Sequence, residues 1–361
     1  MSLAETQPLD FGAQVVSPLL HRAEHRFAAN ITAVTPMAGG DHAFALGDGT
    51  VRLRSIEPAG GKSAFRRAER IAVRHKGAAT ALLPFQGGFV SAGQDGKVVH
   101  LPDSAAGADT LLDMGECWVD ALAVHPPSGR IAAAAERRLV VIDRNGRRQF
   151  EHDAFPSTVS ALSFAPDGRR LVASHLDGLS VLVSDSGARD QLLTWKGSHI
   201  GVSWSPDGRY LVSATQEREL HVWDLVTLGD LRLGGYPHKV HGMHWLTPGP
   251  YLICTGADVI TAWSFADGGP GSKPPIEIGY VYDGLVTAVA AAPDRTLVAG
   301  GYSTGSVLIG GVVKGEALVA RASTGDAVTA LAWAPHGSRL IAGTAAGNAI
   351  VVDVPENAGV Q

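Results

Sequence analysis

A short pattern of apolar and small residues recurs along the whole chain. Each copy has an apolar residue, a residue that is usually polar, a small residue and a second apolar residue. Between the fourth positions of successive copies the steps are 48, 40, 40, 40, 41, 46 and 42 residues. A nearly constant period of this length is typical of repeat architectures built from one supersecondary unit. The eight copies are Ile31–Val34, Ala79–Leu82, Val119–Leu122, Val159–Leu162, His199–Val202, Val240–Met243, Val286–Val289 and Val328–Leu331.

Turn residues divide each repeat into short strands. Pro166–Gly168 and Pro206–Gly208 read Pro-Asp-Gly and follow the first apolar run; proline presets φ and glycine accepts a positive φ. A pair such as Asp95–Gly96 separates the second run from the third, which indicates a hairpin. A more variable fourth run, such as Gln191–Trp195, lies between repeats. Four short strands per repeat, without a helical period, predict the blade of an all-β propeller.

Some of these residues resemble a known family, the WD-repeat (WD40) β-propellers. The resemblance rests on Val159–Gly168 with Leu176–Gly178, and on Val202–Gly208 with His221–Asp224. The literal Trp-Asp pair occurs once, at Trp223–Asp224, and the usual Gly-His dipeptide is absent. The resemblance implies one propeller domain over residues 1–361, with the family's buried Asp–His–Ser–Trp cluster incomplete in most repeats. It also implies a rigid platform for contacts between proteins.

The repeat count and the chain ends suggest how the ring closes. Eight repeats predict eight four-stranded antiparallel blades; seven is the alternative, with Ile31–Leu53 as the weakest repeat. The last repeat ends near Asp353 and leaves no room for its fourth strand before Gln361. Residues 17–25 precede the first repeat at the right offset to supply that strand. We expect this segment to pair with the last blade, since an open ring would leave unpaired edge strands.

Composition and charge exclude several classes of protein. The formal charge is −5 with no basic run, so binding to nucleic acid through phosphate neutralisation is not expected. Charged residues make up only 18% of the chain and apolar residues 45%, which indicates a large buried share. The 44 glycines have no Gly-X-Y period and agree with many turns. The composition therefore excludes collagen, coiled coils and disulfide scaffolds, and its Ala, Gly and Arg usage suggests a bacterial source.

Two cysteines are too few to cross-link a fold of this size. Cys117 and Cys254 fall in distant repeats, so we expect free thiols in a reducing compartment. The first 27 residues lack an apolar run of signal-peptide length, and no 18-residue apolar stretch predicts a membrane span. We therefore expect a cytoplasmic protein without membrane contact.

Two motifs resemble catalytic or nucleotide-binding signatures, but their context is wrong. Gly301–Gly305 matches the Gly-x-Ser-x-Gly elbow of hydrolases, yet Ser303 falls in a turn between two strands and no helix follows. Gly60–Ser63 resembles the end of a phosphate-binding loop, but Ile56 stands where the first glycine is required. A hydrolase is therefore a remote alternative, and we expect neither catalysis nor a cofactor.

Histidines provide a second alternative, a zinc or small-ligand site at the mouth of the channel. His175, His199 and His238 fall in loops that share one rim of a propeller, and Glu217 lies in another such loop. Zinc takes imidazole ligands when they converge from different repeats. The competing interpretation, which we favour, is that each histidine is hydrogen-bonded within its own repeat and holds no metal.

The same rim carries the residue types that are enriched in protein interfaces. We therefore predict a non-catalytic platform for protein–protein contact, a monomeric ring within an assembly, with other proteins as partners and no nucleic acid. The candidate partner-binding residues are Trp118, Arg137, Glu217, Arg218, Lys239, Tyr282 and Tyr302.

Overall fold

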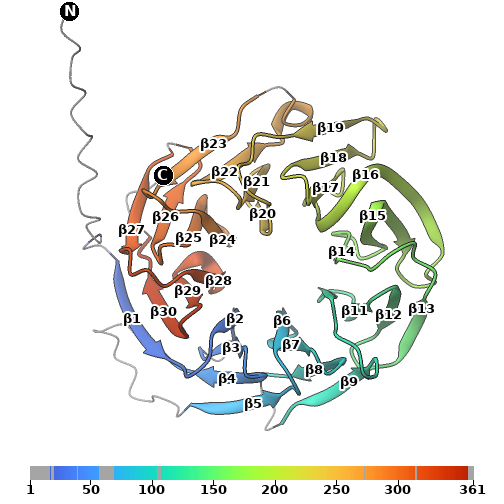
Figure 1. The fold of residues 1–361 in the computed structure, drawn as a ribbon, viewed down its shortest axis with the longest axis horizontal. Coiled ribbons are helices and arrows are strands. Elements are labelled where there is room, and N and C mark those ends of the chain that lie inside the picture. Colours follow the sequence, from blue (N-terminus) through green and yellow to red (C-terminus); the bar gives the residue numbers. More distant parts are fainter. Residues whose placement is uncertain are drawn as a thin grey trace, which may run out of the picture.

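The computed structural model is an all-β ring. It describes residues 17, 20–38, 40–56, 69–103, 107–271, 273–313 and 315–356. These residues form strands β1 to β30 and the 3-10 helices η1 (Ala266–Gly268) and η2 (Pro335–Gly337). The sheets stand side by side around a central axis, in chain order (Figure 1). We number the repeats as units one to eight.

Units one, two and three each form one antiparallel sheet in which the strands pair in chain order. Each unit follows the predicted sequence of turn, hairpin and variable fourth strand. The strands are β2 (Ile31–Pro36), β3 (His42–Leu46), β4 (Thr50–Arg54) and β5 (Arg70–Arg74); β6 (Ala79–Phe85), β7 (Gly88–Gly93), β8 (Lys97–Leu101) and β9 (Asp109–Asp113); and β10 (Ala121–His125), β11 (Arg130–Ala135), β12 (Arg138–Ile142) and β13 (Arg148–His152).

Units six, seven and eight have the same four-stranded design, but unit eight takes one strand from the other end of the chain. The strands of unit six are β20 (Met243–Leu246), β21 (Tyr251–Cys254), β22 (Val259–Ser264) and β23 (Ile276–Tyr280); those of unit seven are β24 (Val286–Ala291), β25 (Leu297–Tyr302), β26 (Val307–Gly311) and β27 (Ala317–Arg321); and those of unit eight are β28 (Val328–Trp333), β29 (Arg339–Thr344), β30 (Asn348–Asp353) and β1 (His21–Arg26).

Units four and five are fused into one sheet of six strands, so the prediction of eight separate sheets is wrong and the alternative number, seven, is the one observed. The described residues form seven sheets, six with four strands and this one with six. Unit one, the weakest by sequence, is nevertheless complete. The fused strands are β14 (Ala161–Phe164), β15 (Arg170–Val183), β16 (Arg189–Trp204), β17 (Tyr210–Thr215), β18 (Leu220–Asp224) and β19 (Asp230–Leu233).

Two long strands cause the fusion. β15 pairs with β14 through Leu171–Ser174 and, beyond a register shift, with β16 as far as Leu182. β16 then continues and pairs with β17 from His199 onward. The pairing of Leu176 with Ser198 extends the strand pairing into the connection between the units, where other units have a loop outside the sheet. β15 therefore contains the second and third strand segments of unit four, and β16 contains the fourth segment of unit four and the first of unit five. Counted in such segments, each of the eight sequence repeats still has four.

The predicted closure of the ring through the N-terminal segment is confirmed. β1 pairs antiparallel with β30, from His21 opposite Asp353 to Arg26 opposite Asn348. The observed strand, His21–Arg26, begins later and ends one residue later than the expected residues 17–25. Pairing the two ends of the chain leaves β30 inside the sheet rather than at an exposed edge, which removes an edge that would otherwise invite aggregation.

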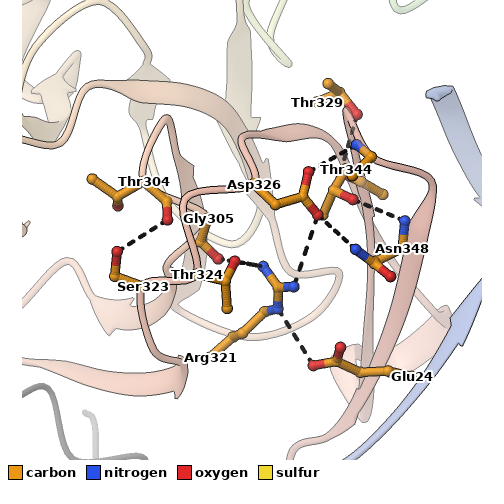
Figure 2. A network of polar contacts seen from close by, with 12 residues as sticks. Glu24, Thr304, Gly305, Arg321, Ser323, Thr324, Asp326, Thr329, Thr344 and Asn348 are labelled. Carbon is orange, nitrogen blue, oxygen red and sulfur yellow. Dashed lines mark hydrogen bonds and ion pairs between the residues drawn. The ribbon is translucent and has the colours of Figure 1, made fainter.

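A buried cation joins the closing strand to its neighbours (Figure 2). Arg321, at the end of β27, is only 3% exposed. Its guanidinium donates to the Gly305 carbonyl at 2.8 Å and the Thr324 hydroxyl at 2.9 Å. It also pairs with Glu24 on β1 at 3.3 Å and with Asp326 at 3.9 Å. One guanidinium therefore connects β1 with the loops of units seven and eight.

Apolar side chains fill the spaces between adjacent sheets. The second and third strands of most units are almost wholly buried, as in β3, β7 and β25, because a sheet lies against each of their faces. Fourth strands such as β13 alternate between exposed and partly buried positions because they lie on the outer wall. Each apolar cluster spans neighbouring units; one of them joins unit seven to unit eight through Val307 and Leu340.

The polar second residue of the recurring pattern has a structural role. Thr32 Oγ1 donates to the Ala79 carbonyl of the next unit at 2.8 Å, and Thr287 Oγ1 donates to the Val328 carbonyl at 2.6 Å. Thr329 makes the same bond across the closure, to the Ile31 carbonyl at 2.6 Å. Thr80 does so less closely, at 3.3 Å to the Val119 carbonyl. These threonines form a belt of hydrogen bonds between the innermost strands.

Candidate functional site

The loops that enter each unit and the turns between its second and third strands meet at one end of the strands, which we call the rim. Hydrogen bonds tie these segments together around the ring. The Val159 N–H donates to the Glu136 carbonyl at 2.7 Å, and the Ser303 N–H donates to the Leu285 carbonyl at 2.8 Å. These backbone hydrogen bonds fix the rim loops relative to one another, so the rim is an ordered surface.

Two arginines of the rim bind the backbone of the next unit in the same way. Arg137 Nε donates to the Phe155 carbonyl, and Arg218 Nη1 donates to the Pro237 carbonyl at 3.0 Å. Both residues are exposed and hold the loop that follows them. Glu217 and Lys239 are also exposed on this surface. The arginines therefore have a structural contact, while Glu217 and Lys239 face solvent.

Trp118 stands at a hollow between units two and three. Its side chain is 60% exposed, far more than is usual for an indole. The hollow has a volume of about 540 Å³ and carries charges of both signs. Its other lining residues are Lys76, Gln94, Asp95, Lys97, Asp113, Gly115 and Glu116.

Tyr282 lies at a second hollow, between units six and seven. Its side chain is 65% exposed, and the neighbouring Tyr280 is 50% exposed. The hollow has a volume of about 490 Å³ and includes two carboxylates, Asp258 and Asp283, but no lysine or arginine. Since Trp118 belongs to unit three, the two exposed aromatic positions are four units apart. They form two separate contact points on one rim.

Tyr302 is the one predicted rim residue that the structure contradicts. Its side chain is fully buried, and its hydroxyl donates to the Gly279 carbonyl at 2.9 Å. Burial raises the pKa of this phenol well above its ordinary value. Tyr302 is the last residue of β25 and faces the sheet of unit six, so it contributes to the core and offers no surface to a partner.

The histidines do not converge. His199 is fully buried, with Nδ1 2.8 Å from the Ser213 hydroxyl and Nε2 2.9 Å from the Trp195 carbonyl. His175 is buried as well, and its two ring nitrogens face the Leu176 carbonyl and the Ser180 hydroxyl. Desolvation lowers the pKa of both imidazoles. Their nitrogens are therefore occupied within the protein.

His238 alone among the three is exposed, and it lines the Tyr282 hollow. Over the described ranges, no three His, Cys, Asp or Glu side chains are grouped so that they could hold a metal ion. The interpretation that His175 and His199 are hydrogen-bonded structural residues thus has direct support, whereas the zinc alternative has none from this geometry.

Ser303 of the hydrolase-like motif also lines the Tyr282 hollow. It follows β25 in a turn that leads to β26, a strand, and its hydroxyl accepts a hydrogen bond from the Leu285 N–H at 3.0 Å. A nucleophile elbow requires a strand, a sharp turn and then a helix. The motif therefore has the wrong surroundings for that role. Gly60–Ser63 lies outside the described residues.

One polar cluster escaped the sequence analysis. His75, which is buried, has Nδ1 2.9 Å from an Asp95 carboxylate oxygen and Nε2 2.9 Å from the Ser91 hydroxyl. His75 lies four residues before Ala79, where the recurring pattern of unit two begins, whereas His199 is itself the first residue of that pattern in unit five. Alignment of the repeats on this pattern therefore did not point to His75. This His–Ser–Asp cluster ties the entry loop of unit two to its second strand and to the turn that follows.

The comparisons with known proteins agree with this architecture. The family model "WD domain, G-beta repeat" matches residues 189–224, which include Trp223–Asp224. Two solved structures match 95% of the chain, each with a TM-score of 0.73: the computationally designed Ika8 protein, 20% identical, and the C-terminal WD40 domain of Sif2, 14% identical. They cover 100% and 99% of those chains, respectively. The protein is a β-propeller.

Curated relatives match shorter segments. A chromatin assembly factor 1 subunit FAS2 homolog from Oryza sativa subsp. japonica is 31% identical over 113 residues, which is 28% of this chain and 22% of that protein. WD repeat-containing protein 1 from Rattus norvegicus is 31% identical over 81 residues, which is 21% of this chain and 13% of that protein. The matches thus span less than a quarter of either relative. Taken with the matched repeat, they show that segments of this propeller are similar to WD-repeat proteins.

Proposed function

We propose that this propeller is a non-catalytic platform that binds other proteins through the rim at Trp118 and Tyr282. The observation that carries the proposal is the exposure of these two aromatic side chains, 60% and 65%, each beside a hollow with charged groups. Large aromatic residues that a partner can desolvate provide most of the binding energy in protein interfaces. Glu217 and Lys239 would then supply charged contacts at the edge, where they affect association rate and specificity more than affinity.

The relatives are compatible with such a role. One of them is named as the homolog of a subunit of an assembly factor, so at least that protein is described as part of a larger complex. By the same reasoning we propose that this ring acts as a monomer within an assembly. Its two cysteines are unpaired, which supports a reducing compartment such as the cytoplasm. No helix of the described chain is long and apolar enough to cross a membrane.

Affinity capture from the native host, followed by mass spectrometry and a binding assay with the captured protein, tests the proposal. We expect Trp118→Ala and Tyr282→Ala each to weaken the measured binding about tenfold or more, as for interface hot spots. Val313→Ala is the matched control: Val313 is 71% exposed but lies in the turn between β26 and β27, at the other end of the strands. Rim variants that bind as well as the unmodified protein would refute the proposed surface.

A further inference from the structure

A hollow of a different kind lies between units five and six, at the end of the strands away from the rim. It has a volume of about 350 Å³, near the lower end for ligand pockets, which suits a single side chain. Aromatic rings dominate its wall, and among the described residues that line it Asp207 alone is charged. The lining residues are Ser205, Pro206, Asp207, Tyr210, Trp245, Gly249, Pro250 and Phe265.

The three aromatic rings hold one another in place. The ring centroids of Tyr210 and Phe265 are 5.1 Å apart, and those of Trp245 and Phe265 are 4.7 Å apart, both in edge-to-face geometry. The Tyr210 hydroxyl is buried and has no hydrogen-bond partner within the described part of the chain. A buried hydroxyl without a partner is unfavourable, so a hydrogen-bond donor that enters the hollow would gain by reaching it.

The interface between units four and five shows which side chain can occupy the position equivalent to this hollow. The turn Ser205-Pro-Asp-Gly-Arg-Tyr210 of unit five corresponds to Ala165-Pro-Asp-Gly-Arg-Arg170 of unit four. Trp245 corresponds to Trp204, since each indole N–H donates to a serine of the preceding unit, at 3.1 and 3.2 Å. Between units four and five, the Arg170 guanidinium carbon lies 4.7 Å from the Trp204 ring centroid. The next interface has Tyr210 in place of that arginine.

The charges of the hollow favour a cation. Arg209 is nearby, 4.8 Å from the Tyr210 ring centroid, but it donates to both carboxylate oxygens of Asp224 and is neutralised there. Asp207 accepts hydrogen bonds from the Ser205 hydroxyl and the Arg209 N–H through one oxygen, Oδ1. Its second oxygen has no partner in the described part of the chain. The hollow therefore combines aromatic rings with a carboxylate that forms no ion pair within the described part of the chain, since the Arg209 guanidinium is bound to Asp224.

We propose that this hollow binds the guanidinium group of an arginine side chain from a partner protein. The guanidinium would take the place beside Trp245 that Arg170 takes beside Trp204 one interface earlier. A planar guanidinium stacks on aromatic faces and can donate to a carboxylate and to a hydroxyl at the same time. The site lies at the opposite end of the strands from Trp118 and Tyr282, so it does not depend on the function proposed for the rim.

N-acetyl-arginine amide is the probe, with N-acetyl-citrulline amide as its uncharged counterpart of almost the same shape. The readout is the NMR signal of the Trp245 indole N–H, assigned with the variant Trp245→Phe. We expect a saturable shift of this signal with the arginine compound at millimolar concentration, and at least fivefold weaker binding of the citrulline compound. Equal binding of the two compounds, or no shift of the Trp245 signal, would overturn the proposal.

Paired variants separate the hollow from general surface charge. Asp207→Asn should weaken binding of the arginine compound at least threefold, whereas Asp167→Asn, at the equivalent turn of unit four, should leave it unchanged. Tyr210→Arg should fill the hollow from within and abolish the shift; if that variant does not fold, the two aspartate variants decide. An equal loss in both aspartate variants would refute the proposal, as would a proline-rich peptide without arginine that saturates the same signal more tightly.

Discussion

Arg321 and Glu24 form an ion pair of 3.3 Å although 297 positions separate them in the sequence. The pair connects β27 of unit seven to the closing strand of unit eight. The two partners differ in environment, because Arg321 is almost fully buried while the Glu24 side chain is 36% exposed. The stability of the closure should therefore depend on the arginine far more than on the glutamate.

The first prediction concerns this contrast. Arg321→Met should lower the free energy of unfolding by about 3 kcal/mol, because it leaves Asp326 and the Gly305 carbonyl without their cation. Glu24→Gln should cost about 1 kcal/mol or less, since partly exposed ion pairs contribute little. Urea unfolding of both variants measures the difference. Equal losses would mean that the buried guanidinium is not what holds β1.

The threonine belt gives a second prediction. Thr329→Val removes the hydroxyl that donates to the Ile31 carbonyl across the closure. We expect a loss of about 1–2 kcal/mol in unfolding free energy. The control is Thr158→Val, because Thr158 is exposed and its hydroxyl makes no such bond. If both variants unfold at the same urea concentration, the belt does not stabilise the ring.

The third prediction concerns pH. His221 is fully buried and stacks on Trp195 with ring centroids 3.9 Å apart, and desolvation lowers its pKa from 6.5 to about 4. Between pH 6.5 and 4, His221 therefore binds a proton in the unfolded protein but stays neutral in the folded protein. This contribution, on the order of 3 kcal/mol, is fully present above pH 6.5 and is lost as the pH falls toward 4.

His221→Phe tests this prediction, because phenylalanine keeps a ring in the stack but cannot be protonated. The variant should lose less stability between pH 6.5 and 4 than the unmodified protein, as measured by urea unfolding at each pH. The other histidines are the same in both proteins, so the comparison isolates the effect of replacing His221. Identical pH profiles would show that His221 does not contribute to acid unfolding.

Thiol reactivity provides the fourth prediction. Cys254 is fully buried, and desolvation raises its pKa to about 12. Cys117 is only partly buried, although desolvation raises its pKa too. Iodoacetamide at pH 8 should therefore label Cys117 slowly in the folded protein and Cys254 only in denaturant. Mass spectrometry of the alkylated peptides measures this, and rapid labelling of Cys254 in native buffer would contradict its placement.

The features that were predicted from the sequence are those that depend on a local residue pattern. Alternation and turn residues set the strands, and the offset of residues 17–25 from the first repeat predicted the pairing of β1 with β30. The fusion of units four and five was missed because it depends on the strand pairing of Leu176 with Ser198, in segments that look like ordinary turn and loop. The pattern of apolar residues does not predict whether the backbone of such a connection pairs with a neighbouring strand.

The candidate site was predictable only in part, because a turn residue can face outward or inward. Trp118 and Tyr282 are exposed, whereas Tyr302 turns toward the Gly279 carbonyl and is buried. That choice depends on the neighbouring unit, about 20 residues back along the chain, and not on the residues beside Tyr302. The hollow between units five and six drew attention only when the structure allowed units to be compared, because Tyr210 stands where unit four has Arg170.

The origin of β1 has a consequence for biosynthesis. Unit eight cannot be completed until Asp353 has been synthesised, although its fourth strand precedes all the other strands in the chain. At 5–20 residues per second, translation of the chain takes roughly 20–70 s, and throughout this time β1 has no partner. His21–Arg26 therefore stays unpaired during synthesis, and the ring can close only after the last of its other strands has been made.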